Sequence, residues 1–211
     1  MIRIYPFIFI LLWSSAFITT KPIVDNSDPF SALAFRFFFV ALGFYLFSIY
    51  SKQSIFVNQK NLIESLLSGV LFHGFYLGGV FYSISIGMPT GIAALIVTLQ
   101  PILTNTLSGP ILGEKVTVKQ WIGVFLGFLG AVMVLGIDVG SNIPMLGLVA
   151  TIIALVSITA STIWQKKLSN NLPLSVSNFY QAVGGCLFHM LIILFFTKPF
   201  INFTETFIIA M

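Results

Sequence analysis

Residues 87–136 read GMPTGIAALIVTLQPILTNTLSGPILGEKVTVKQWIGVFLGFLGAVMVLG. The stretch predicts two apolar helices, at about 91–112 and 118–136, joined by a short charged turn at Gly113-Glu114-Lys115. Each helix is about 20 residues long, which is the length that crosses the hydrocarbon core of a bilayer. Two adjacent apolar runs of this length indicate a membrane protein.

The composition of the whole chain indicates the same class. Of its 211 residues, 57% are hydrophobic and 8% are charged, whereas about a quarter of the residues of a soluble domain are charged. Further apolar runs predict membrane spans at 4–20, 30–50, 62–86, 145–164 and 175–197. The predicted fold class is an all-α polytopic membrane protein, a bundle of about seven transmembrane helices with the start of an eighth at 207–211.

The basic residues are divided unequally between the two ends of the predicted spans. With a cytoplasmic N-terminus, the cytoplasmic segments hold Arg3, Lys52, Lys60, Lys115, Lys119, Lys166 and Lys167, and the other side holds Lys21 and Lys198. Cytoplasmic loops are enriched in Lys and Arg, so we expect a multi-pass protein of the cell (inner) membrane with its N-terminus in the cytoplasm. A cleaved signal peptide is the alternative for the first run, but its removal would upset this charge division.

The sequence also repeats itself weakly at an offset of 144 residues. The most informative pairs are Pro29 with Pro173, Ser31 with Ser175 and Asn58 with Asn202. The first copy, 1–140, holds five spans, and because five is odd the second copy, 145–211, would be inverted in the membrane. A complete second copy would need about 70 further residues, or three spans. We therefore expect a shortened gene product or a fragment, with two helices of the second repeat and the start of a third.

Short motifs carry a resemblance to one transporter family. They are Trp13-Ser14-Ser15-Ala16-Phe17, Pro29 followed by Phe35-Arg36-Phe37, Gln100-Pro101, Leu112-Gly113-Glu114-Lys115, and Gly123 with Gly127-Phe128-Leu129-Gly130. On these residues the chain resembles the drug/metabolite transporter superfamily, in its ten-span branch built from two EamA-type repeats. The resemblance implies a first five-helix repeat at 1–140 and an incomplete second one at 145–211.

The resemblance implies a secondary-active permease that moves a small metabolite, often an amino acid or a related compound, without ATP. Two inverted repeats would work by alternating access. The expected partners are the lipid bilayer and a small-molecule substrate, with proton coupling as a further expectation and no cofactor. Two alternatives stay open: an integral-membrane enzyme acting on a lipid-linked substrate, and a remnant that does not transport. Short chains could still transport if they assembled into a homo-oligomer.

Other chemistries lack their sequence signatures. The chain contains no P-loop, no HExxH, no GxSxG and a single cysteine, Cys186. Its basic residues are dispersed and form no nucleic-acid-binding face. A membrane enzyme would need clustered acidic or histidine residues at one interface, whereas Asp25, Asp28 and Asp138 are scattered. We therefore predict no catalytic residue, no metal site and no nucleic-acid partner.

Arg36 is the first candidate for substrate binding. It stands about seven residues into the second predicted span, among phenylalanines. An arginine near the centre of a membrane helix costs about 2.5–3.5 kcal/mol on insertion scales, so its side chain should face a cavity or a partner. It would either bind a substrate carboxylate through its planar fork, or extend to the outer interface, or pair with Asp25 or Asp28.

His73 and Tyr76 are the next candidates. They are three residues apart on the third predicted span, so an α-helix places them on one face, which Ser83 continues. A neutral imidazole in a cavity takes up and releases protons and would couple transport to a proton gradient. The alternative is a structural hydrogen bond to a neighbouring helix, and His189 on the seventh span has the same two roles open to it.

The fourth predicted span combines a helix break with a polar stripe. Pro101 removes one backbone donor and should loosen the helix. Thr98, Asn105 and Ser108 line the face of Pro101, with Gln100 and Thr104 beside it. We interpret the stripe as part of a substrate path, and the alternative is interhelical hydrogen bonding.

The remaining candidates are weaker. Trp13 would be an aromatic residue of the cavity, and Tyr180-Gln181 would stand in the place of Phe35-Arg36 in the second repeat. Small residues form two ridges for close helix packing, at Gly123, Gly127 and Ala131 and at Gly74-x-x-x-Gly78. Glu114 is expected to cap a helix or pair with Lys115 or Lys119 at the cytoplasmic face.

Overall fold

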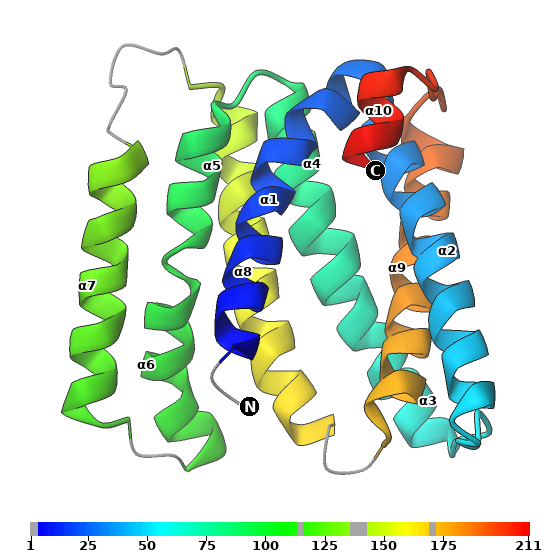
Figure 1. The fold of residues 1–211 in the computed structure, drawn as a ribbon, viewed down its shortest axis with the longest axis horizontal. Helices are drawn as coiled ribbons and strands as arrows, with labels where there is room; N and C mark the ends of the chain where they lie inside the picture. The colour runs from blue at the N-terminus through cyan, green and yellow to red at the C-terminus, as the bar shows by residue number, and fades with distance from the viewer. Residues whose placement is uncertain (1–3, 114–115, 136–142, 169–171) are drawn as a thin grey trace.

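The computed structural model describes residues 4–113, 116–135, 143–168 and 172–211. Glu114, Lys115 and Asp138 lie outside these residues, so the predicted role of Glu114 stays a prediction. The helices are α1 (Tyr5–Asn26), α2 (Pro29–Tyr50), α3 (Gln59–Gly69), η1 (Val70–Leu77), α4 (Gly78–Ser85), α5 (Thr90–Val97), α6 (Gln100–Leu112), α7 (Val118–Leu135), α8 (Met145–Leu168), α9 (Leu174–Phe196) and α10 (Glu205–Ala210). Some consecutive helices continue one another and form a single upright segment. These segments alternate in direction across one bundle (Figure 1).

Five helical segments are long and apolar enough to cross a membrane. They are Pro29–Tyr50, Gln59–Ser85, Thr90–Leu112, Met145–Lys166 and Leu174–Phe196. The other two predicted spans correspond to α1 and α7. The apolar stretch of α7, Val118–Gly130, is shorter than the five segments named above. The predicted class, an all-α polytopic membrane protein, is confirmed.

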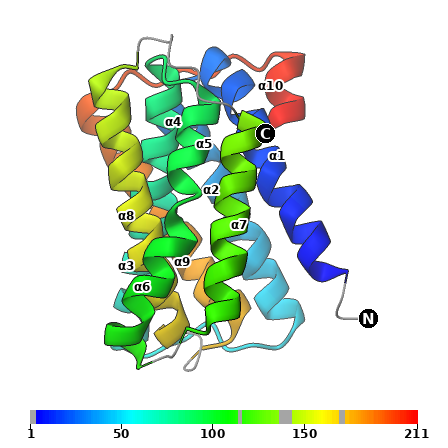
Figure 2. The ribbon, with the colours of Figure 1, turned by 90° about the vertical axis from the view of Figure 1, so that its left-hand side faces the viewer.

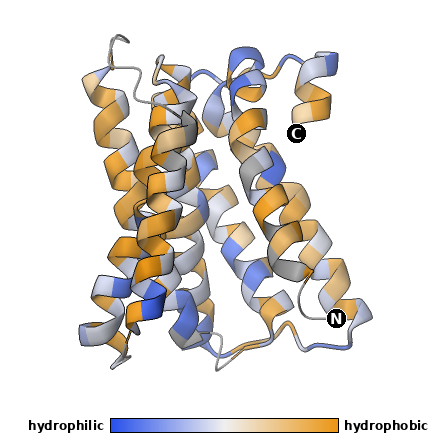
Figure 3. Cartoon of the chain, turned by 60° about the vertical axis from the view of Figure 1, so that its left-hand side comes forward, coloured by the Kyte–Doolittle hydropathy of each residue, from blue (hydrophilic) through white to orange (hydrophobic). Residues whose placement is uncertain are grey.

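The bundle has apolar side chains on its outside, and inside it small polar side chains are buried together with an apolar core. Phe38, Leu46 and Phe47 of α2 are more than half exposed, as expected of a surface that contacts lipid. Buried hydroxyl residues lie between the helices instead: Ser48, Ser65, Ser68, Ser83, Thr151, Ser157, Thr159, Ser161, Ser175 and Ser177. Small residues let membrane helices approach closely, and hydrophobic residues cover the middle of the helices in Figure 3.

The first helix is longer than the sequence suggests. The turn residues at 21–29 predict a loop, yet α1 continues through Pro22 to Asn26. Lys21 and Asp25 form an ion pair one helical turn apart, and Asn26 donates to the carbonyl of Pro22, so local side chains support the extra turn. The other end of α1 leans away from the bundle (Figure 2), where Leu11 and Leu12 are about 70% exposed.

The third span changes its helix type in the middle. Between α3 and α4 the chain forms a π-helix, η1, over Val70–Leu77. A π-helix has wider turns than an α-helix, with hydrogen bonds from residue i to i+5, and it often marks a functional site. The sequence gives no sign of this change, which alters the directions of His73 and Tyr76.

The fourth span is interrupted just before Pro101. α5 ends at Val97 and α6 begins at Gln100, with Pro101 in its first turn. A proline is tolerated there because its missing N–H has no helical partner in any case. The interruption therefore lies beside the polar residues Thr98 and Gln100.

Helices α3 and η1 approach α9 very closely. A Cβ atom on Gly69 would lie 2.0 Å from the carbonyl oxygen of Gln181, and one on Gly184 would lie 2.4 Å from that of Leu66. A Cβ on Gly185 would lie 2.4 Å from the Cβ of His73. Only glycine permits these approaches. Gly74 also packs closely, against Phe188, so the predicted ridge that begins at Gly74 is in contact with α9.

The other predicted ridge does not pack against a neighbour within the described residues. A Cβ on Gly123 or Gly127 of α7 would meet no atom within 4 Å. The side chain of Ala131 lies outside the described residues. The prediction of close packing along this face of α7 is therefore wrong for the part of the chain that the structure describes.

The glycine contact can be tested by adding one methyl group. We expect Gly184→Ala to lower the free energy of unfolding by about 1–3 kcal/mol, the range typical of overpacking. The reason is that the backbone of α3 occupies the space that the added methyl group needs. The measurement is the thermal midpoint of the purified protein in detergent. Gly43→Ala is the matched control, since nothing lies within 4 Å of its Cβ position. Equal midpoints for the two variants would contradict the contact.

Candidate functional site

A cavity of about 170 Å³ lies between α1, α2 and the third span. Its lining residues are Trp13, Ala16, Phe17 and Thr20 from α1, Arg36 from α2, Phe72, Tyr76 and Leu77 from η1, and Val80 and Phe81 from α4. A cavity of about 150 Å³ accepts a molecule of the size of benzene. The site is therefore large enough for part or all of a small metabolite.

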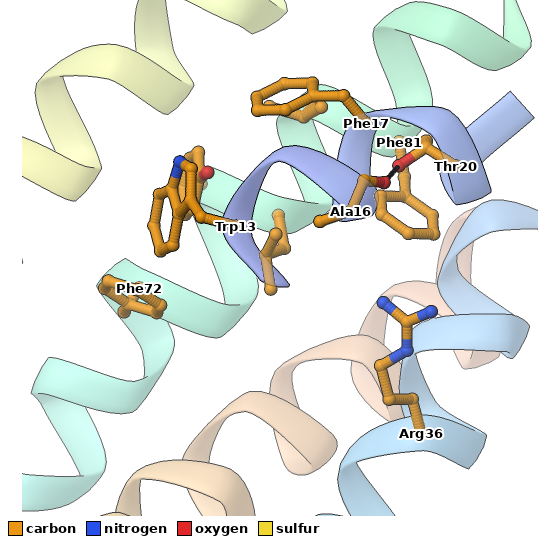
Figure 4. A pocket seen from close by; sticks show the side chains of 10 residues that line it. Trp13, Ala16, Phe17, Thr20, Arg36, Phe72 and Phe81 are labelled. Carbon is orange, nitrogen blue, oxygen red and sulfur yellow. Dashed lines mark hydrogen bonds between the residues drawn. The ribbon is translucent and has the colours of Figure 1, made fainter. Parts of the chain in front are cut away.

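Arg36 supplies the charge of this cavity. Its side chain extends from α2 towards Ala16, Thr20 and Phe81 (Figure 4), and its Cζ lies 5.5 Å from the centre of the Phe81 ring. The guanidinium group forms no ion pair or hydrogen bond with another residue that the structure describes. It therefore retains its planar array of N–H donors for a ligand.

The two acidic residues that could neutralise Arg36 have other partners. Asp28 precedes α2 and accepts hydrogen bonds from the backbone N–H and the hydroxyl of Ser31, both at 2.8 Å. Asp25 pairs with Lys21. Of the alternatives for Arg36, pairing with Asp25 or Asp28 is absent among the described residues.

Aromatic rings form the opposite wall. Trp13 of α1 stacks on Tyr76 of η1, with ring centres 6.4 Å apart and planes within 10°. Phe72 meets the edge of Tyr76 at 5.5 Å. One cation facing several aromatic rings suits a ligand that has an anionic group at one end and an apolar body at the other.

His73 does not line the cavity, although its ring lies 5.1 Å from that of Phe72, which does. Its ring packs 4.3 Å from that of Phe37, and Gly185 of α9 lies against its Cβ. His189 donates a hydrogen bond from Nε2 to the carbonyl of His73 at 3.0 Å. Tyr76 therefore lines the cavity and His73 does not, so the two residues do not share the cavity that their spacing predicts.

The predicted polar residues Gln100 of α6 and Gln181 of α9 lie outside this cavity, in two separate sets of hydrogen bonds to α8. Gln100 donates to Thr104 at 3.0 Å and to Thr162 of α8 at 3.3 Å. Gln165 of α8 donates to Gln181 of α9 at 2.8 Å, and Gln181 donates to Ser177. Asn105 is half-buried, and its backbone carbonyl accepts from Ser108.

The structure thus brings together three of the predicted residues, Trp13, Arg36 and Tyr76, in one cavity. Gln100, Asn105, His73 and Gln181 do not line it. Phe72 and Phe81 are cavity residues that the sequence analysis missed, because phenylalanines in a chain with 23 of them carry no distinguishing signal. In the described part of the chain, no three His, Cys, Asp or Glu residues lie close enough together to hold a metal ion.

Comparison with known proteins places this architecture in a family. The EamA-like transporter family matches residues 3–136, which contain the whole of the Arg36 cavity. This chain belongs to the EamA-like transporter family. The resemblance carried by the short motifs is therefore confirmed.

Relatives of this EamA-type chain include the uncharacterized transporter YvbV of Bacillus subtilis, 28% identical over 161 residues, covering 71% of this chain and 51% of the relative. A probable amino-acid metabolite efflux pump of Escherichia coli is 26% identical over 163 residues, covering 77% of this chain and 52% of the relative. The uncharacterized transporter YyaM of Bacillus subtilis is 26% identical over 204 residues, covering 90% of this chain and 64% of the relative. The chain spans about half the length of the first two of these relatives.

The polar network makes a prediction about stability. We expect Gln181→Leu to destabilise the bundle by about 0.6–1.7 kcal/mol, the measured range for polar contacts between membrane helices, because Gln165 and Ser177 each lose a partner. Thermal midpoints in detergent give the comparison. Gln53→Leu, in an exposed loop, is the control and should leave the midpoint unchanged. A midpoint for Gln181→Leu equal to that of the control would argue against the network.

Proposed function

We propose that this chain belongs to a secondary-active permease that carries a small metabolite with a carboxylate group, an amino acid or a related compound, across the cell membrane. The observation that carries the proposal is the guanidinium of Arg36. It opens into the cavity and has no ion pair among the described residues. An ionisable residue inside a membrane helix marks a functional site by default.

The cavity also indicates the kind of molecule that would bind. Arg36 would hold the carboxylate through two parallel hydrogen bonds. Trp13, Tyr76 and Phe72 would then contact the apolar part of the ligand. The volume of about 170 Å³ suits a single side chain of the size of a benzene ring. The similarity to a probable amino-acid metabolite efflux pump of Escherichia coli is consistent with this class of cargo.

Transport would proceed by alternating access between two inverted repeats, at 1–140 and 145–211. The directions of the helices support this arrangement. Pro29 begins α2 and Pro173 immediately precedes α9, as the offset of 144 predicts, and the two helices run in opposite directions (Figure 1). The division of basic residues assigns the end of the bundle that carries the N-terminus to the cytoplasm.

The competing functions have less support. An enzyme acting on a lipid-linked substrate would need acidic or histidine groups converging on one site, and the relatives are named as transporters. A remnant that does not transport would gain nothing from an arginine that has no ion pair among the described residues, because the residue carries an insertion cost of about 2.5–3.5 kcal/mol.

The carboxylate proposal is tested by changing protein and ligand together. We expect Arg36→Gln to weaken binding of L-phenylalanine roughly ten- to hundredfold, since a charge-assisted hydrogen bond contributes about 1.5–3 kcal/mol. L-Phenylalaninamide, which lacks the carboxylate, should bind weakly to the original protein and lose little more in the variant. Equilibrium binding to purified protein measures both ligands. Equal losses for the acid and the amide would contradict the proposal.

Proton coupling is assigned to the histidine pair at the α2, η1 and α9 contact. A carbonyl only accepts hydrogen bonds, so the Nε2 of His189 carries the hydrogen that contacts His73. The Nδ1 atoms of both rings are buried without a partner among the described residues. Either atom would therefore be the place where a proton enters.

We expect His189→Gln to abolish transport driven by a pH gradient while retaining exchange of substrate across the membrane. The glutamine amide can still donate to the carbonyl of His73 but takes up no proton at neutral pH. Uptake and counterflow in proteoliposomes, with and without a pH gradient, separate the two activities. Gradient-driven transport at the original rate would remove His189 from the coupling mechanism.

A further inference from the structure

A larger cavity lies between α3, α6 and α8, apart from the Arg36 cavity. Its volume is about 630 Å³. Among the described residues that line it, Glu64 of α3 and Thr159 of α8 are polar, and the others are aliphatic or aromatic, including Leu107 of α6 and Trp164 of α8. We call it the Glu64 cavity. Its charge is a carboxylate among apolar side chains, whereas the charge of the Arg36 cavity is positive.

The Glu64 cavity opens on a surface of the bundle that would contact lipid. Leu107, Ile111 and Val156 line it and are 40%, 45% and 57% exposed. Helices α6 and α8 lie side by side here (Figure 2). Val156 and Trp164 are eight residues apart on α8, a rise of about 12 Å, and Trp164 is near the end of the helix, where tryptophans meet lipid headgroups. The cavity therefore has the depth and the apolar walls to hold part of an acyl chain.

Glu64 places a negative charge at the headgroup end of this cavity. It is half-buried and lies in the second turn of α3, which begins at the end of the bundle where α6 and α8 end (Figure 1). The carboxylate forms no ion pair or hydrogen bond with another described residue, although Lys60 is one turn away, at a spacing that permits a pair. The hydroxyl of Thr159 donates to the carbonyl of Leu155 at 2.8 Å. A half-buried carboxylate without a partner is costly, so it is suited to a cationic ligand.

We propose that the Glu64 cavity is a binding site for a phospholipid with a primary ammonium headgroup. The ammonium would donate hydrogen bonds to the carboxylate of Glu64, and an acyl chain would lie between α6 and α8. A primary ammonium has three N–H donors, whereas a choline headgroup has none. The headgroup of an anionic lipid would be repelled by the carboxylate. The site goes beyond the proposed function, because it requires no particular cargo in the Arg36 cavity.

The test measures which lipid the purified protein retains. The chain in detergent is titrated with an equal mixture of dioleoyl phosphatidylethanolamine, phosphatidylcholine and phosphatidylglycerol, and native mass spectrometry identifies the bound lipid. Glu64→Gln removes the charge and keeps the size of the side chain. Glu205→Gln is the matched control, because Glu205 is an exposed acidic residue of α10 that does not line the cavity. Every variant is first checked for a monodisperse profile.

A second pair of variants locates the lipid. Ala160 lines the cavity, so Ala160→Phe places a ring where the acyl chain would lie. Val149→Phe on the same helix is its control, since Val149 is 45% exposed and does not line the cavity. None of the changed residues lines the Arg36 cavity, so the result is separate from the test of the proposed function.

We expect the original protein and both controls to retain phosphatidylethanolamine about two- to fivefold in excess over each other lipid, the range for one ion pair at a partly exposed site. Glu64→Gln should bind the three lipids equally, and Ala160→Phe should bind less phosphatidylethanolamine. An original protein without this preference, a Glu64→Gln variant that keeps it, or an Ala160→Phe variant that binds phosphatidylethanolamine as before would each overturn the proposal.

Discussion

The arrangement of the bundle depends on how closely α3 and η1 approach α9. Gly69, Gly184 and Gly185 remove the side chains that would keep these helices apart. The contact holds the middle of the third span against α9, which in turn packs along α2. It therefore fixes the position of η1, the segment that carries Tyr76 of the Arg36 cavity and also His73, which contacts α9. In a bilayer, where apolar surfaces gain little by leaving lipid, such close packing is a main source of helix association.

Arg36 and the Gln165–Gln181 pair show two ways in which a membrane protein keeps polar groups in an apolar chain. Arg36 remains without an ion pair among the described residues because Asp28 is used to begin α2. The amides of Gln165 and Gln181 satisfy one another across α8 and α9. The first arrangement leaves donors for a ligand, and the second builds a rigid polar wall.

The sequence was informative where one strong physical cost decides the outcome. Long apolar runs identified the spans, and the cost of a charge in lipid predicted that Arg36 faces a cavity or a partner. Prediction from the sequence failed where several weak effects compete. The continuation of α1 through Pro22 depends on local side-chain bonds, and the change to a π-helix at η1 has no compositional signal. Glycine spacing drew attention to Gly74 but equally to Gly123, and only the positions of neighbouring helices distinguish the two.

The central claim is that the guanidinium of Arg36 contacts a substrate carboxylate inside the membrane. Arg3 and Arg36 are the two arginines of the chain, so Arg3→Lys leaves a protein in which ¹⁵N-labelled arginine reports on Arg36 alone. Solid-state NMR in lipid bilayers then measures the dipolar coupling between the guanidinium nitrogens and ¹³C-carboxyl-labelled L-phenylalanine. We expect a coupling that corresponds to direct hydrogen bonding, with nitrogen and carboxylate oxygen about 2.7–2.9 Å apart. A bound ligand whose carboxylate shows no coupling to Arg36 would contradict it.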